Sequence, residues 1–239
     1  MFLRSFVLIL FFGFAWSTSS KASTTEVILG DTTVGIEQMA NGKGKAFVHV
    51  HQNETTALKA AKAVVRQHGG SVLTLHHPGG RNIDFHLHGV KYAFDPNRMF
   101  TDEGIEKTLK TQGAYSKEAH QAVKRLAKTV LAYLPPNKKI IAVHNNETYS
   151  LQDYYEGHPL QKEAAALHVP QPEGYRNFYL TTKLDEYSLL KQTGFNALLQ
   201  APSAEDDGSL SIYLKDKPYI NVEAGYDALH TQIKMLESI

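Results

Sequence analysis

The sequence predicts an α/β fold, a three-layer sandwich in which helices flank a central mixed β-sheet. Short β-branched or alternating apolar segments alternate with segments of helical periodicity through most of the chain. No stretch rich in Pro, Gly or Ser divides the chain after its first two dozen residues. Residues 23–239 are therefore expected to form a single domain, which is a usual size for one core.

The N-terminal segment predicts a secretory signal peptide over residues 1–22. Arg4 precedes an apolar run from Phe6 to Ala15 that is too short to span a bilayer comfortably. Ser20 and Ala22 put small residues at positions −3 and −1 of a cleavage site, and an uncleaved anchor is the alternative. The sequence has no cysteine, so the mature protein is held together without disulfides. We expect an exported protein, periplasmic or secreted.

The first half of the chain is expected to supply strands around one helix. Apolar residues at helical spacing predict that helix over residues 55–68, ending at a Gly-Gly pair. The expected strands are 26–30, 33–37, 46–51, 71–75, 83–87 and 90–94, of which the last two form a hairpin around His88-Gly89.

The second half is expected to begin with helices at Thr101 and Ser116, the latter helix ending at Pro135-Pro136. Residues 149–175 are expected to be a loop, with tyrosines that could cover a site. The remaining expected elements are strands at 139–143, 177–182, 196–199, 209–214 and 219–223, with helices at 185–192 and from about Tyr226 onward. The strands at 209–214 and 219–223 are expected to pair with each other.

The charge balance bears on the kind of partner. The chain has 25 basic and 24 acidic side chains, a net charge of +1, with both signs interspersed. Nucleic-acid and membrane-surface partners call for a basic excess or a basic stripe. We therefore expect no nucleic-acid partner, no membrane association after signal cleavage, and a small peptide or acylated amino acid as substrate.

Polar residues follow three apolar strands at the points where they end: His51 to Glu54, His144 to Asn146, and Glu223 to Gly225. In an open α/β sheet, ligands bind beyond the carboxyl ends of the strands. His51 and Glu54 are three residues apart, so both side chains can converge on one ion from the same side of a tight turn. Two histidines and a glutamate make an open zinc site, which keeps a position for water.

The His-x-x-Glu pattern alone has a simpler explanation, a surface histidine followed by a glutamate at a helix N-terminus. A second Val-His-x-Asn-Glu segment also makes Glu147, beside His144, a rival to Glu54. We favour Glu54 because the first copy leads directly into a helical pattern, whereas the second leads into a loop.

Four short motifs in one order strengthen the metal hypothesis. They are His51-Gln-Asn-Glu54, Asp95-Pro-Asn97-Arg98-Met-Phe100, Val143-His144 and Glu223-Ala-Gly225. Together they resemble the zinc carboxypeptidase superfamily, most of all its succinylglutamate desuccinylase and aspartoacylase branch. The resemblance extends from about residue 46 to 230 and implies a zinc-carboxypeptidase-like fold. It also implies that His51, Glu54 and His144 hold one Zn²⁺ ion.

The resemblance implies roles for residues around the metal as well. Glu223 would be the general base that activates metal-bound water and then protonates the leaving amine. Asn97 and Arg98 would bind a free carboxylate of the substrate, for which the planar guanidinium fork is suited. A further cation would stabilise the oxyanion. Arg81 and Lys91 are candidates, and we favour Arg81 because a guanidinium stays charged in a partly buried site.

These features predict an exported zinc-dependent hydrolase that cleaves an amide bond next to a free carboxylate. The substrate class includes a peptide C-terminus, a cell-wall peptide and an N-acyl amino acid. Two alternatives belong to other classes of protein: a non-catalytic exported metal-binding protein, using the histidine-rich hairpin with His86 and His88, and a non-catalytic protein that only binds a carboxylated ligand.

Overall fold

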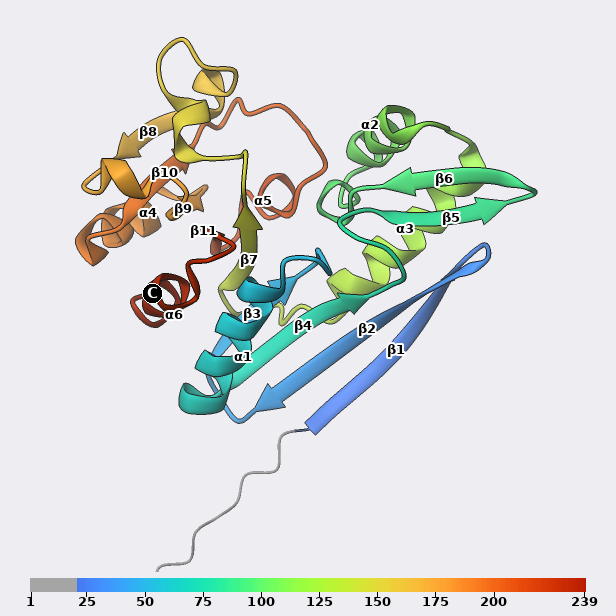
Figure 1. Ribbon diagram of the computed structural model, residues 1–239, viewed down its shortest axis with the longest axis horizontal. Coiled ribbons are helices and arrows are strands. Elements are labelled where there is room, and N and C mark those ends of the chain that lie inside the picture. Colours follow the sequence, from blue (N-terminus) through green and yellow to red (C-terminus); the bar gives the residue numbers. More distant parts are fainter. Residues whose placement is uncertain (1–20) are drawn as a thin grey trace, which may run out of the picture.

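The computed structural model describes residues 21–239 and has an α/β fold with a large mixed central sheet flanked by helices (Figure 1). This confirms the predicted α/β class with a central mixed sheet between helices. The sheet has nine strands in the order β1-β2-β4-β3-β7-β11-β9-β10-β8. These strands are β1 (Lys21–Leu29), β2 (Thr32–Asn41), β3 (Lys45–His49), β4 (Gly70–His76), β7 (Ile140–Asn146), β8 (Ala164–His168), β9 (Phe178–Thr181), β10 (Asn196–Gln200) and β11 (Tyr219–Gly225).

The centre of the sheet is parallel. Strands β4, β3, β7 and β11 pair in parallel in that order, whereas β2 and β9 pair antiparallel at the two sides of this group. The central strands are apolar on both faces, as expected for parallel strands that are covered by helices. Their carboxyl ends meet at one edge, where the polar residues that follow β3 and those in the last part of β7 and β11 come together.

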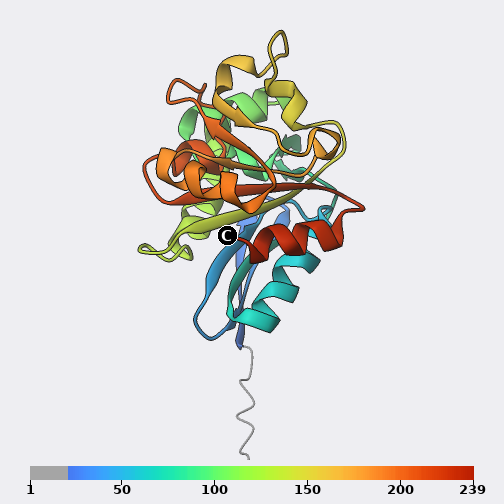
Figure 2. The ribbon, with the colours of Figure 1, turned by 90° about the vertical axis from the view of Figure 1, so that its left-hand side faces the viewer.

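The helices form one layer on each face of the sheet. On one face α1 (Thr55–His68), α4 (Leu184–Leu190) and α6 (Leu229–Glu237) contribute to a shared core. On the other face the covering elements are α2 (Asp102–Gln112), α3 (Lys117–Ala132), α5 (Leu210–Tyr213) and the hairpin of β5 (Ile83–Leu87) and β6 (Val90–Phe94). Helices α1 and α6 lie side by side (Figure 2).

Helix α1 has the bounds that the sequence predicts. Its buried residues include Ala57, Ala61, Val64 and Val65, which recur at helical spacing and face the sheet. The helix ends at Gly69, whose φ of +79° is a left-handed conformation that favours glycine. This helix starts directly after Glu54, so its packing on the sheet determines where the Glu54 side chain lies.

The segment 209–214 was expected to be a strand, and this prediction is wrong. Residues Leu210–Tyr213 form the short helix α5, and the Ser209 hydroxyl accepts a hydrogen bond from the backbone N–H of Ile212. Strand β11 pairs with β7 on one side and β9 on the other, so it has no edge left for a hairpin partner. The alternating pattern of this segment instead buries Leu210 and Leu214 in the core.

The sequence predicted a loop over residues 149–175, and this prediction is wrong for part of the segment. It contains the short strand β8, which pairs antiparallel with β10 at the edge of the sheet. The strand sequence Ala-Ala-Ala-Leu-His is poor in β-branched residues, so it gives no local strand signal.

The predicted signal peptide covers residues 1–22, and residues 1–20 lie outside the described part of the chain. It therefore stays a prediction. Among residues 21–239, no helix has the length and apolar character needed to cross a membrane.

Candidate metal centre

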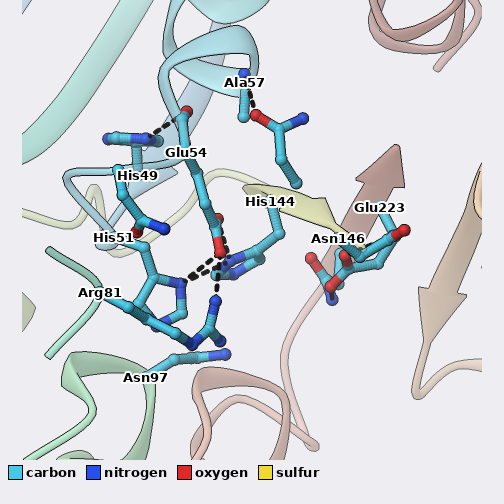
Figure 3. Close-up of polar contacts among 12 residues, drawn as sticks. His49, His51, Glu54, Ala57, Arg81, Asn97, His144, Asn146 and Glu223 are labelled. Carbon is cyan, nitrogen blue, oxygen red and sulfur yellow. Dashed lines mark hydrogen bonds and ion pairs between the residues drawn. The ribbon is translucent and has the colours of Figure 1, made fainter. Parts of the chain in front are cut away.

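The predicted metal ligands come from two segments at the carboxyl edge of the sheet. His51 follows β3, and a backbone hydrogen bond of 3.0 Å from Glu54 N–H to His51 C=O closes a turn between them. This turn puts both side chains on one side, and Glu54 lies at the start of α1. His144 lies on the neighbouring strand β7 and points toward them (Figure 3).

His51, Glu54 and His144 form one buried cluster. Their exposed fractions are 0%, 0% and 3%. The two Nδ1 atoms lie 3.2 Å apart, and each lies 2.9 Å from an oxygen of the Glu54 carboxylate. One ligand atom from each residue thus lies within 4.8 Å of the others.

This cluster fits a metal ion. Zinc binds imidazole nitrogen and carboxylate oxygen at about 2.0–2.2 Å, which places tetrahedral ligand atoms roughly 3.3–3.5 Å from one another. The observed separations of 2.9–3.2 Å are slightly shorter, so a small outward movement of the side chains accommodates an ion. The three residues could hold one metal ion, with the remaining coordination positions open to the cavity beside them.

A second carboxylate orients the first histidine. Asp95, which follows β6, lies with Oδ1 2.6 Å from His51 Nε2. Metal-binding histidines commonly pair their other nitrogen with a carboxylate, which fixes the ring and its tautomer. Asp95 belongs to the Asp-Pro-Asn-Arg motif, but the sequence does not predict this contact. The one sequence signal for it is that Asp95 comes directly after a strand, as His51 does.

The charges of the cluster are strongly coupled. Burial by itself would lower the pKa of His51, but the carboxylates of Glu54 and Asp95 outweigh burial and raise this pKa to about 9. Burial would likewise raise the pKa of Glu54, yet the imidazoles of His51 and His144 hold it well below its ordinary value. The cluster therefore favours positive charge between its carboxylates, which a bound cation would supply in place of protons.

His49, on the face of β3 that α1 covers, supports the cluster through the backbone of Glu54. Its Nε2 lies 2.9 Å from the backbone oxygen of Glu54, and its Nδ1 lies 2.9 Å from the hydroxyl of Thr74. Burial lowers the pKa of His49 to about 4, so this ring is neutral at pH 7. It acts as a packing histidine that holds the backbone of a ligand residue.

A cavity of about 620 Å³ opens beside the cluster. It is lined by six of the seven predicted site residues, whereas His51 lies behind them. These six residues are Glu54, Arg81, Asn97, Arg98, His144 and Glu223. Tyr149 and Tyr154 also line it, with their hydroxyl oxygens 2.5 Å apart.

Glu223 lies on β11, directly opposite His144 on the parallel strand β7. It is 6% exposed, and each of its carboxylate oxygens accepts a hydrogen bond from an amide side chain. The donors are Asn146 Nδ2 at 3.1 Å and Asn221 Nδ2 at 3.0 Å. These two contacts fix the carboxylate at the cavity, beside Asn146 and one strand away from His144 (Figure 3). The sequence does not single out Asn221, although it lies two residues before Glu223 and so shares its face of the strand.

Arg81 and Lys91 lie in different places. Arg81 Nη1 lies 2.6 Å from Glu54 Oε1, and Arg81 Nε lies 3.3 Å from Asp95 Oδ2. Lys91 lies on the hairpin, 2.7 Å from Asp84, and does not line the cavity. Of the two candidates, only Arg81 is near the cluster.

Asn97 and Arg98 form the short helix Pro96–Arg98 after Asp95. The side-chain oxygen of Asn97 accepts a hydrogen bond from the N–H of Leu210 at 3.2 Å, which links this turn to α5. Arg98 Nη1 lies 3.4 Å from an oxygen of Asp207. The guanidinium therefore already lies beside a carboxylate of the chain at the cavity wall.

The other histidines and the rival glutamate lie outside the cluster. Glu147 is exposed at the cavity, one residue past the end of β7. His86 pairs with Asp31 and His88 with Glu118, both at exposed positions. Within residues 21–239, no second group of three His, Cys, Asp or Glu side chains converges closely enough to hold an ion.

Neither the protein-family models nor the curated proteins that were compared with the chain gave a match. The resemblance to zinc carboxypeptidases thus depends on the four short motifs alone.

Proposed function

We propose that this chain is an exported zinc-dependent hydrolase with a zinc-carboxypeptidase-like fold, which cleaves an amide bond next to a free carboxylate. The main support is the convergence of His51 Nδ1, His144 Nδ1 and the Glu54 carboxylate in a buried cluster at the wall of a large cavity. Export is proposed from the signal peptide over residues 1–22.

Bound zinc would supply a Lewis acid that polarises the substrate carbonyl and lowers the pKa of a water molecule. His51, Glu54 and His144 would hold it, and Asp95 would fix the orientation of His51. Two neutral histidines and one glutamate keep a net positive charge on a zinc centre, which favours both effects.

Glu223 is proposed as the general base that accepts a proton from water and returns it to the leaving amine. The two amide donors from Asn146 and Asn221 support this role, because they hold both oxygens of the carboxylate in a fixed orientation at the cavity. Arg81 is proposed to stabilise negative charge on the carbonyl oxygen, and Asn97 with Arg98 to bind the substrate carboxylate. Binding there requires the substrate to compete with Asp207 for the guanidinium.

The test is the Glu223→Gln variant of the zinc-loaded protein, assayed on N-acyl amino acids and on peptides with a free C-terminus. Loss of the base is expected to lower kcat by about 10²–10⁴-fold while zinc content is unchanged. Glu147→Gln is the matched control, because Glu147 lines the same cavity but is exposed. Full turnover by Glu223→Gln contradicts the proposed base.

Metal analysis separates the alternatives. A wild-type protein that binds one zinc ion but cleaves no substrate in this panel is a carboxylate-binding or metal-binding protein. Binding of several zinc ions that does not depend on His144 supports the histidine-rich hairpin instead. If the protein is the proposed hydrolase, the wild-type chain is expected to bind one zinc ion, and the His144→Ala variant is expected to bind none.

A further inference from the structure

The edge of the sheet opposite the metal centre gathers positive charge. Strands β3, β7 and β11 start at this amino edge, and residues 41–45, 135–139 and 214–218 lead into them. The charged residues of these three segments are six lysines and one aspartate: Lys43, Lys45, Lys138, Lys139, Lys215, Lys217 and Asp216. The sequence shows no basic run, because the three segments are far apart along the chain.

The strand register holds the three segments together. Ile140, the first residue of β7, pairs with the second residue of β3 and with the first residue of β11. Lys138 Nζ donates a hydrogen bond of 3.4 Å to the backbone oxygen of Gly44, and the N–H of Ile140 donates one of 3.1 Å to that of Pro218. Neighbouring strands lie about 4.8 Å apart, so charges that precede three adjacent strands lie within about one Debye length and act together.

Four of the six lysines form a surface that we call the basic edge. They are exposed and pair with no carboxylate within residues 21–239: Lys43, Lys138, Lys215 and Lys217. The charged groups nearest to them balance in number, with Lys45, Lys139, Lys183 and Arg66 against Asp185, Glu186, Asp216 and Glu237. The four positive charges of the basic edge are therefore not offset, and they attract an anionic partner.

An apolar groove of about 420 Å³ opens at the basic edge. Lys138 and Lys217 line it together with Leu134, Pro136 and Tyr213. The Tyr213 side chain is 45% exposed. Tyrosine and lysine are the side chains that lie at the level of lipid headgroups, where anionic groups adjoin apolar chains. The groove thus favours a lipid surface over a purely polar polyanion.

The described chain also starts at this edge (Figure 1). Lys21, the first residue of β1, belongs to a row of paired residues that runs through Ala40 and Ser71 to the start of β3. Residues 16–20 separate Lys21 from the apolar run of the predicted signal peptide. Such a segment spans at most about 20 Å, so an apolar run that enters the membrane during export brings this edge of the sheet to the membrane surface.

We infer that the basic edge binds the surface of a membrane that contains anionic phospholipids, with the lipid phosphates against its lysines. The metal centre then faces away from the membrane, because the seven residues of β7 separate the two edges by roughly 20 Å. This inference does not depend on the proposed hydrolase. It differs from the expectation drawn from the net charge of +1, since that sum does not contain the positions of the charges.

The test measures co-sedimentation of the purified full chain with two kinds of vesicle. One kind has equal parts of phosphatidylcholine and phosphatidylglycerol, and the other has phosphatidylcholine alone. Binding through the apolar run is the same for every variant, so the ratio of the two partition coefficients isolates the effect of charge. Each lysine near an anionic surface contributes about fivefold, so we expect a ratio of at least about 30 at low salt, falling as salt is added. A ratio near one overturns the inference.

Two double variants locate the binding surface. Lys138→Gln with Lys217→Gln removes two charges from the basic edge and is expected to lower the ratio by at least about tenfold. Lys59→Gln with Lys117→Gln is the matched control, because both lysines are exposed and lie near the starts of α1 and α3, at the opposite edge. It removes the same charge and is expected to change the ratio by less than about twofold. Equal losses in the two double variants overturn the inference.

Polyglutamate tests the alternative partner, an acidic protein segment. Displacement of the protein from the anionic vesicles, when polyglutamate carboxylates equal the exposed lipid phosphates in concentration, assigns the basic edge to an acidic polymer and overturns the lipid assignment. Retention on the vesicles supports it. A preference for anionic vesicles in a protein that cleaves no substrate supports the basic edge and contradicts only the hydrolase.

Discussion

Two five-residue segments with almost the same sequence have different roles in this protein. Residues 50–54 are Val-His-Gln-Asn-Glu, and residues 143–147 are Val-His-Asn-Asn-Glu. Both histidines belong to the buried cluster, but Glu54 is 0% exposed within it and Glu147 is exposed. The asparagines differ as well, since Asn53 is exposed whereas its counterpart Asn146 is buried beside Glu223.

The backbone explains the difference. Strand β3 ends at His49, and the chain turns after His51, so that residues three apart lie on the same side. Strand β7 continues through Asn146, so His144 and Asn146 share one face while Asn145 points to the other. Glu147 then lies just beyond the strand. The length of the strand, and not the local sequence, decides which glutamate reaches the buried cluster.

The largest expected effect distinguishes the two glutamates. Glu54→Gln removes a ligand oxygen and the negative charge between two imidazoles, so zinc affinity is expected to fall by at least about 100-fold, more than is typical for an outer-shell change. Glu147→Gln is expected to change the affinity by less than about threefold. Competition with a chromophoric chelator measures both. A greater loss in Glu147→Gln would reverse the assignment of the ligands.

The next effect concerns stability and compares Asn145 with Gln52, the residue at the same place in the first segment. Asn145 Oδ1 accepts a hydrogen bond from the N–H of Ala57 at 2.7 Å, and Asn145 Nδ2 donates to Gln232 Oε1 at 3.1 Å and to the backbone oxygen of Ala224 at 3.3 Å. Asn145→Ala removes these three bonds, so we expect unfolding to require about 2–3 kcal/mol less.

Gln52→Ala removes a single bond, the one that Gln52 Oε1 accepts from His77 N–H, and is expected to cost about 1 kcal/mol. Urea denaturation of the two variants gives the comparison. Equal losses of unfolding free energy would show that the Asn145 link from β7 to α1 stabilises the fold no more than the single Gln52 bond does.

Much of the fold could be predicted because its signals are local. The helix at 55–68 shows apolar periodicity with a glycine end, and the hairpin at 83–94 has its Gly turn, so each of them follows from its own residues. Segment 209–214 and strand β8 could not be predicted this way. Whether these segments become helix or strand depends on which sheet edges other strands already occupy, and that is a property of the whole topology.

The candidate site likewise contains some residues that the sequence could predict and others that depend on the topology. His51, Glu54 and His144 could be proposed because each follows or ends an apolar strand. The roles of Asp95 and Asn221 could not, because an aspartate after β6 or an asparagine inside β11 has ordinary explanations until the neighbouring strands are known. Arg81 was preferred to Lys91 from the chemistry of the guanidinium, but its contacts with Glu54 and Asp95 could not be predicted, because they depend on where the loop after β4 lies.

The smallest expected effect concerns the asparagine pair and also tests how Glu223 is held. Asn146→Ala removes one of the two donors to the Glu223 carboxylate and leaves that oxygen without its buried partner. We expect kcat to fall by about tenfold, a change of about 1.4 kcal/mol in the activation free energy, with zinc content unchanged.

The control is Asn53→Ala, which removes an exposed contact to the Tyr226 hydroxyl and is expected to change kcat by less than about twofold. Loss of zinc from Asn146→Ala would instead mean that this asparagine supports the ligands, because His144 lies on the same strand face. Asn146 is buried and Asn53 is exposed. An equal loss of kcat in both variants would mean that this difference in burial has no effect on function.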